Sequence, residues 1–284
     1  MENTGGRELT WSTAGVRTVT DEAALRAALA DASCTFIQLA EDLAVSGDLT
    51  ITKAVVTGAE KLVVSGGSLT LQGTSAVLLG SVDLGGGELR LIDGATAACG
   101  PENCAAITVE NAMLVTELPL RVSGGRISLA DSGKLLALRG MVLEAGELAV
   151  GEGCAVRVSG EIVLESGSRA ELGPQGELLV DNADLLVDGS SVLETSQGSL
   201  WELVYTHDGY PRRLEGEFLL SGRTYFSPFV IAAGHLVNEG ELEFADTLTV
   251  AGTLENRGVL RSLHGAQLEV EDGGVFTGAQ PQVG

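Results

Sequence analysis

Short apolar–polar–apolar triplets recur along this chain at nearly constant spacing. One set starts at positions 49, 69, 89, 107, 127 and 148, so successive starts lie 20, 20, 18, 20 and 21 residues apart. Such alternation is typical of a short β-strand with one buried side. The triplets of this first column are Leu49–Ile51, Leu69–Leu71, Leu89–Leu91, Ile107–Val109, Ile127–Leu129 and Leu148–Val150.

Two more columns of triplets fall between the members of the first. Three strands in every period of about twenty residues predict a solenoid, an all-β fold in which the chain coils. The second column comprises Val77–Leu79, Met113–Val115, Leu135–Ala137, Val156–Val158 and Leu178–Val180. The third comprises Leu62–Val64, Val82–Leu84, Leu120–Val122, Val142–Glu144, Ile162–Leu164 and Leu185–Val187.

The coiling follows from the length of these strands, because a three-residue strand cannot stand alone. Stacking each strand on its counterpart one turn later, about 4.8 Å away, pairs its backbone. Alternation then points Leu49, Leu69 and Leu89 into one interior column and turns Thr50 and Arg90 toward water. We therefore predict β-helix turns over residues 33–195.

One segment near the start has a helical pattern instead. The stretch "TVTDEAALRAALADAS" offers Thr20 or Asp21 as an N-cap and places Leu25, Ala28 and Leu29 on one face. The open end of a solenoid exposes its core and unpaired strand edges. We predict that residues 16–32 form a short helix that caps this end.

The regular spacing fails over residues 196–232, which contain seven of the eleven aromatic residues. Aromatic faces stack on sugars or peptides, and arginines pair with carboxylates. One interpretation is a ligand-binding patch; the other is a β-hairpin around "HDGYP" that covers the rod. Beyond it, residues 233–284 resume short strands, predicted as further turns. The candidate binding residues are Trp201, Tyr205, Tyr210, Arg212, Arg213 and Arg223.

Composition narrows the class of partner. The 284-residue chain is 44% hydrophobic, contains 39 glycines and carries a net charge of −22. That charge repels nucleic acid and anionic membranes, which require clustered Lys and Arg. No apolar run reaches the roughly 18–20 residues of a membrane helix. The charge is compatible with a solvated repetitive surface, with cation binding or with cationic partners, and the oligomeric state is open.

Carboxylates are the main candidates for chemistry. A row of acidic residues follows the first column, and stacked carboxylates could bind Ca²⁺ or act as acid and base on a sugar. The alternative is an ordinary row of solvated turns. A second acidic group occurs in "DNADLLVDG", whose spacing matches no calcium loop. The row comprises Asp93, Glu110, Asp131 and Glu152, and the second group comprises Asp181, Asp184 and Asp188.

The cysteines and the first residues leave the compartment open. Cys99 and Cys104 flank "GPEN" and could close a small disulfide loop, whereas Cys34 and Cys154 are expected to be buried apolar residues. Spacing of this kind disfavours a zinc site. The start "MENTGGRELTWS" has no pattern of a signal peptide. It fits a cytoplasmic protein or a secreted chain without its leader.

Two stretches carry a resemblance to a known class. "TDEAALRAALADAS" followed by "FIQLAEDLAVSGDLTI" resembles the start of right-handed parallel β-helices of the pectin-lyase-like class. "FVIAAGHLVNEGELEFADTLTVAGTLENRGVL" looks like repeats of large bacterial cell-surface, adhesin-like proteins. The resemblance covers most of residues 16–278 and implies a right-handed parallel β-helix, a fold that hosts lyases, hydrolases and adhesins.

The function expected from this resemblance is a non-catalytic, secreted or cell-surface module for adhesion or structural display. Its partner would be an extracellular glycan or a cell-surface protein. A polysaccharide lyase or glycoside hydrolase with a groove along the rod is the alternative, and a cytoplasmic assembly platform is a third. No motif of a lyase or nucleophile is present to name a catalytic residue.

Overall fold

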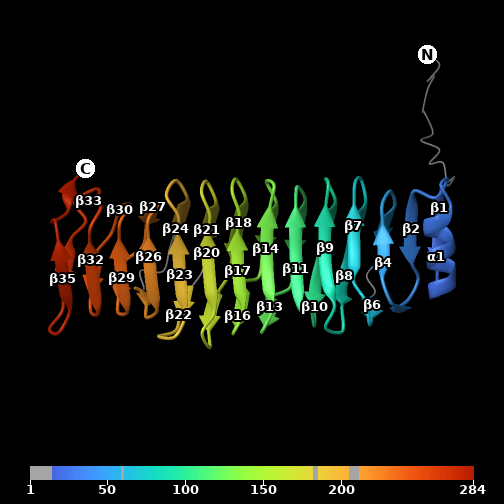
Figure 1. The fold of residues 1–284 in the computed structure, drawn as a ribbon, viewed down its shortest axis with the longest axis horizontal. Coiled ribbons are helices and arrows are strands. Elements are labelled where there is room, and N and C mark those ends of the chain that lie inside the picture. The colour runs from blue at the N-terminus through green and yellow to red at the C-terminus, as the bar shows by residue number, and fades with distance from the viewer. Residues whose placement is uncertain (1–14, 59–60, 182–184, 205–210) are drawn as a thin grey trace, which may run out of the picture.

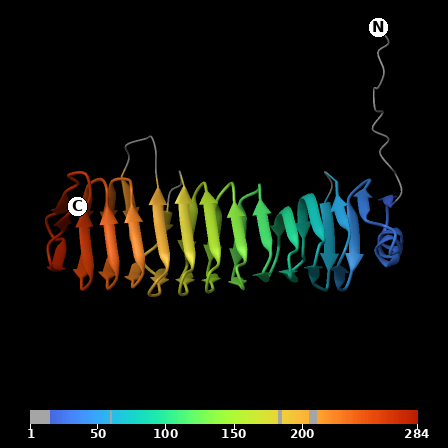
Figure 2. The same ribbon diagram turned by 90° about the horizontal axis from the view of Figure 1, so that it is seen from above.

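The fold is a parallel β-solenoid of about 13 turns with about 20 residues per turn. The computed structural model describes residues 15–58, 61–181, 185–204 and 211–284. In these ranges the only helix is one short segment at the N-terminal end of a long, narrow rod (Figures 1 and 2). The predicted all-β solenoid is therefore confirmed.

Two long sheets run along the rod, and we name them sheets A and B. Sheet A stacks β1 (Val16–Val19), β2 (Phe36–Leu39), β5 (Val55–Thr57), β8 (Ala76–Asp83), β10 (Thr96–Glu102), β12 (Met113–Thr116), β15 (Lys134–Ala137), β18 (Ala155–Ser159), β21 (Glu177–Asp181), β24 (Leu200–Val204), β27 (Arg223–Phe226), β30 (Glu241–Phe244), β33 (Val259–Ser262) and β36 (Gln282–Val283). Sheet B stacks β4 (Leu49–Ile51), β7 (Leu69–Gln72), β9 (Glu88–Ile92), β11 (Ala106–Glu110), β14 (Arg126–Ala130), β17 (Glu147–Val150), β20 (Arg169–Leu172), β23 (Val192–Thr195), β26 (Glu217–Leu220), β29 (His235–Asn238), β32 (Thr253–Asn256) and β35 (Val275–Gly278).

A third side of the rod is built in pieces. In the first coils, β3 (Leu43–Ser46) and β6 (Lys61–Ser65) pair with each other, and the second halves of β8 and β10 extend this ladder. Sheet C then stacks β13 (Leu120–Ser123), β16 (Met141–Glu144), β19 (Ile162–Glu165) and β22 (Leu185–Val187). Sheet D stacks β25 (Arg212–Leu214), β28 (Val230–Ala232), β31 (Leu248–Val250) and β34 (Leu268–Val270).

The third side is interrupted twice among the described strands: β10 and β13 share no ladder pairing, and neither do β22 and β25. Proline explains the first interruption, because it has no N–H to donate to a ladder. Pro101 lies in the second half of β10 and Pro119 directly precedes β13. A cavity of about 550 Å³ lies there, lined by both prolines and by Arg121.

The first predicted column forms the strands of sheet B from β4 to β17. Leu49, Leu69 and Leu89 are register partners, and each is at most 1% exposed. The column continues without a shift through Ile107, Ile127 and Leu148. The alternation therefore identified both the strand and its buried side.

The second and third columns were correct in place but wrong in register at two strands. Met113 pairs with Lys134 and faces outward, and the inward residue of β12 is Leu114. On β16, Met141 and Leu143 are buried in place of Val142. A slip of one residue reverses the side that each side chain faces. A run of three apolar residues such as "MLV" is compatible with both registers, so the sequence does not distinguish them.

The helix α1 (Glu22–Ala30) covers the N-terminal end of the core. Asp21 is its N-cap, and its carboxylate accepts a hydrogen bond of 2.7 Å from the Ala24 amide. Leu25 and Ala28 are fully buried and belong to the continuous core. The helix is shorter than the predicted span of 16–32, because β1 occupies the first four of those residues.

The aromatic segment continues the solenoid, so the prediction of an irregular insertion or hairpin over 196–232 is wrong for the described residues. Strand β24 pairs in parallel with β21 and β27, and β26 pairs in parallel with β23 and β29. The "HDGYP" stretch covers positions 207–211, of which 207–210 lie outside the described residues.

Residues 233–284 continue the rod, with a polar ladder inside. The buried Asn238 donates to the Asn256 side chain at 2.8 Å, and Asn256 donates to the Ala279 carbonyl at 2.8 Å. Glycines allow the turns to stack closely here: a Cβ at Gly252 would lie 2.2 Å from the Gly234 carbonyl oxygen.

Candidate interaction surface

Trp201 lies in the core, not in a binding patch. It is fully buried, its ring stacks on Phe218 at 5.8 Å, and Phe226 meets it edge-on at 5.1 Å. These rings occupy inward positions that Leu and Val fill in other coils, so the aromatic cluster replaces aliphatic packing. The prediction that Trp201 stacks on a ligand is therefore wrong.

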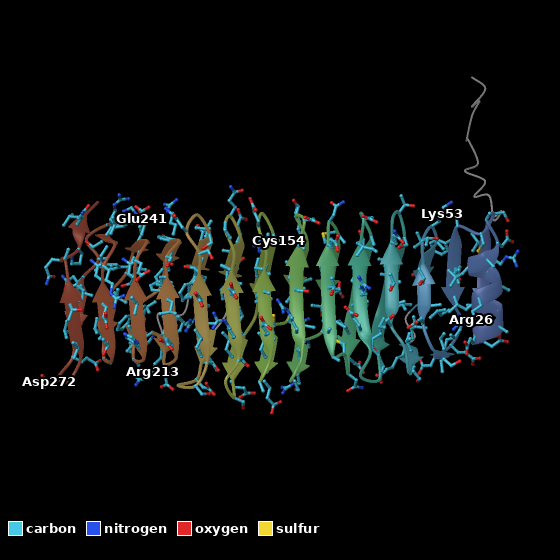
Figure 3. The ribbon with its side chains drawn as sticks, in the orientation of Figure 1. Arg26, Lys53, Cys154, Arg213, Glu241 and Asp272 are labelled. Atoms are coloured by element: carbon cyan, nitrogen blue, oxygen red, sulfur yellow. The ribbon has the colours of Figure 1, made fainter. Side chains whose placement is uncertain are left out.

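The other predicted binding residues do not converge. Arg212 is buried on β25 of sheet D, and Arg213 beside it pairs with Glu215 at 2.8 Å. Arg223 lies on sheet A and pairs with Glu243 at 2.7 Å. Figure 3 shows Arg213 and the sheet A residue Glu241 at opposite edges of the rod. Tyr205 and Tyr210 lie outside the described residues.

The predicted acidic row reflects backbone geometry. Asp93 and Asp131 have φ angles of 55° and 49°, and Asn111 in the intervening turn has a φ of 45°. Asp and Asn are the non-glycine residues that best tolerate this left-handed conformation. Glu110 ends β11 one position before that turn, and Glu152 lies beside Gly153, which has a φ of 66°. The turn interpretation therefore accounts for these residues.

The second acidic group is already occupied by protein donors. The Asp181 carboxylate accepts from Arg157 at 2.6 Å, and the Asp188 carboxylate accepts from the Ser166 amide at 2.8 Å. Ser190 and Ser191 also donate to Asp188 through their hydroxyls at 2.8 Å. Asp184 lies outside the described residues. No cluster of metal-binding side chains occurs in the part of the chain that the structure describes.

The cysteines are buried thiols. Cys99 and Cys104 are 4% and 7% exposed and form no disulfide with each other. Burial raises the pKa of Cys99 to about 12 and that of Cys104 to about 11. Both thiols therefore stay protonated and unreactive at neutral pH. Cys34 and Cys154 are buried as expected.

A surface that the sequence pattern did not reveal lies on the outer side of sheet A. Five consecutive strands there, β2, β5, the first half of β8, the first half of β10, and β12, turn only uncharged side chains outward. We call this surface the uncharged face. It consists of two rows: Phe36, Val55, Ala76, Thr96 and Met113 in one, and Gln38, Thr57, Leu78, Ala98 and Val115 in the other. The second halves of β8 and β10 belong to the third side of the rod, where Asp83 and Glu102 pair with Lys61.

The uncharged face is open to solvent. Leu78 is 43% exposed, Met113 38% and Phe36 36%. Val16 on the adjoining β1 is 45% exposed and extends the first row. Exposed apolar patches of this kind mark interaction sites when they are contiguous. In a chain of charge −22, two uncharged rows that cross five neighbouring strands form such a patch.

The same two rows become charged farther along sheet A. Lys134 follows Met113 in the first row, and Arg157 is the first charged residue of the second. Toward the C-terminus, Glu243 lies between two arginines that pair with it, Arg223 at 2.7 Å and Arg261 at 3.3 Å. The Arg223 guanidinium and, to a lesser extent, Arg261 hold the pKa of Glu243 below its usual value although partial burial opposes this.

Comparisons of the chain with family models, with curated proteins and with solved structures find no match. No helix in the described part of the chain has the length and apolar character to cross a membrane. The structure shows a parallel β-solenoid whose outer side on sheet A carries the uncharged face.

Proposed function

We propose that this protein is a non-catalytic β-solenoid module for adhesion or structural display, secreted or attached to a cell surface. The observation that carries the proposal is that uncharged and charged side chains occupy separate stretches of a rigid rod. One stretch of sheet A is uncharged and apolar, whereas the adjoining coils carry charged side chains that pair with one another. Such an arrangement suits docking at one place and solvation elsewhere.

Rigidity supports a display role. A single core of buried Leu, Val and Ile runs from Val19 to Leu260, and parallel ladders join every described coil to the next. Sheet A has fourteen strands along its path, which correspond to a rod of about 60 Å at about 4.8 Å per strand. A rod of this kind holds its surfaces at fixed distances without flexible joints.

A polysaccharide assay tests the absence of catalysis. We expect no release of reducing or unsaturated products from neutral and acidic polysaccharides, with or without Ca²⁺. Binding without product release would support an adhesive role, and we expect it to survive Asp93→Asn and Asp131→Asn because these carboxylates serve turn geometry. Product release that those two substitutions abolish would overturn the proposal in favour of a lyase or hydrolase.

A further inference from the structure

We propose that the uncharged face binds the same face of a second copy of this chain, with the two rods antiparallel and overlapping only in their N-terminal coils. This assembly goes beyond the proposed display function and stands without it. It rests on the charge, the spacing and the order of side chains along sheet A.

Charge selects this face for self-association. Two copies that each carry −22 repel, and a carboxylate enclosed between them would lose its hydration. The outward rows from Phe36 to Val115 contain no charge, so two identical faces can meet without burying an ion. Burial of Leu78, Met113 and Phe36 supplies the favourable free energy.

Spacing favours a solenoid as the partner. The side chains of each row repeat at the strand separation, about 4.8 Å, over five strands. A second copy presents rows with the same repeat, so side chains meet in step along the whole face. Flat sheets with identical repeats pack in this manner in dry interfaces between stacked strands. A globular partner presents no such repeat over the same length.

The order of residues selects the antiparallel arrangement. With the rods parallel, the two rows exchange across the interface, and Glu241 would lie opposite Glu243 of the second copy. When the rods are antiparallel and the two-fold axis passes at β8, Ala76 lies opposite Ala76 of the second copy and Leu78 lies opposite Leu78. Phe36 then lies opposite Met113 of the second copy. Lys134 of β15 then lies at the rim of the overlap, opposite Val16 of the second copy, and the charged strands from β18 onward extend beyond the overlap and face solvent.

The size of the overlap predicts a weak dimer. Seven strands, β1 to β15 along sheet A, span about 30 Å, and three residues across the strands span about 10 Å. The resulting contact, on the order of 300 Å² per copy, is well below the roughly 800 Å² of a stable interface. We therefore expect a reversible dimer that forms at high protein concentration.

Sedimentation equilibrium tests the surface. The wild type should show a reversible monomer–dimer equilibrium that strengthens between 0.05 and 0.5 M NaCl, because salt screens the repulsion between the acidic rods. Leu78→Lys should weaken association at least tenfold. The matched control is Leu186→Lys, since Leu186 is 45% exposed on sheet C, and it should leave association unchanged.

Small-angle X-ray scattering of the wild type tests the orientation. An antiparallel dimer that overlaps in seven strands should lengthen the rod from about 60 Å to about 95 Å, whereas a parallel dimer would keep the monomer length. A monomer at all concentrations and salts would overturn the inference, as would equal effects of Leu78→Lys and Leu186→Lys. An unlengthened dimer would overturn the antiparallel arrangement. None of these outcomes bears on the release of saccharide products.

Discussion

Single residues in the turns show how a solenoid can imitate a catalytic or metal site. Asp93, Asn111 and Asp131 occupy equivalent turns with positive φ, and an asparagine serves in that position as well as an aspartate. The common requirement is therefore a left-handed backbone, which Asp and Asn tolerate through local hydrogen bonds. The spacing of about twenty residues between these carboxylates therefore reflects the number of residues per coil and does not indicate a shared ligand.

Asp188 is the acidic residue whose role is clearest at this scale. Burial tends to raise the pKa of its carboxyl, but hydrogen bonds from Ser166, Ser190 and Ser191 outweigh burial and lower the pKa to about 2. An unfolded aspartate has a pKa near 3.9. The stabilisation of the folded state by the ionised Asp188 carboxylate is therefore complete above about pH 4 and is lost as the pH falls toward about 2.

The matching experiment compares urea unfolding of the wild type and Asp188→Asn between pH 6 and pH 2. We expect the wild type to be more stable at pH 6 and the difference to shrink as Asp188 becomes protonated. Asp131→Asn makes the same change of charge on an exposed turn and serves as the control. A difference that stays constant down to pH 2 would contradict the role assigned to the Asp188 carboxylate.

Among the elements, α1 has the most distinct task, because it closes the N-terminal end of the core. We expect Leu25→Ala to destabilise the first coils by about 2–5 kcal/mol through the cavity it leaves. In a solenoid each coil contacts its neighbours only, so the loss should remain local. Amide hydrogen exchange should show reduced protection in β1 to β4 and unchanged protection in β17 to β20.

Leu164→Ala makes the same substitution at a residue that is 1% exposed in the middle of the rod. It should reduce protection on both sides of β19. If Leu25→Ala lowered protection uniformly along the rod, the coils would unfold as one unit and the local account of α1 would be wrong.

The strands also show which features the sequence could predict. Sheet B was predicted in the correct register from β4 to β17, because Leu, Ile or Val occupies the inward positions of each of these strands. Strand β10 was missed because its inward residues include Ala97 and Cys99, which are small and resemble loop composition. The uncharged face was missed for another reason: its members lie about twenty residues apart and become neighbours only once the register is known. Trp201 suggested a surface patch because aromatic residues are rare in this core, where it stacks on Phe218.

At the scale of the whole molecule, the first of the two interruptions of the third side divides the rod. Sheets A and B pass continuously through the coils that contain β10 and β13, but the third ladder does not. Coupling between these coils therefore rests on two ladders, and a cavity of about 550 Å³ removes packing beside the third. In a solenoid, the weakest interface between neighbouring coils sets where cooperative unfolding divides.

We therefore expect the rod to unfold in at least two blocks that meet between β10 and β13. Native-state hydrogen exchange at increasing urea should give one common opening free energy for β4 to β9 and a different one for β14 to β20. The comparison interface lies between β17 and β20, where all three ladders are intact, and both sides should open together. A single opening free energy from β4 to β20 would show that two ladders couple the coils as tightly as three. The prolines at this interruption would then change the surface of the rod without separating it into blocks that unfold independently.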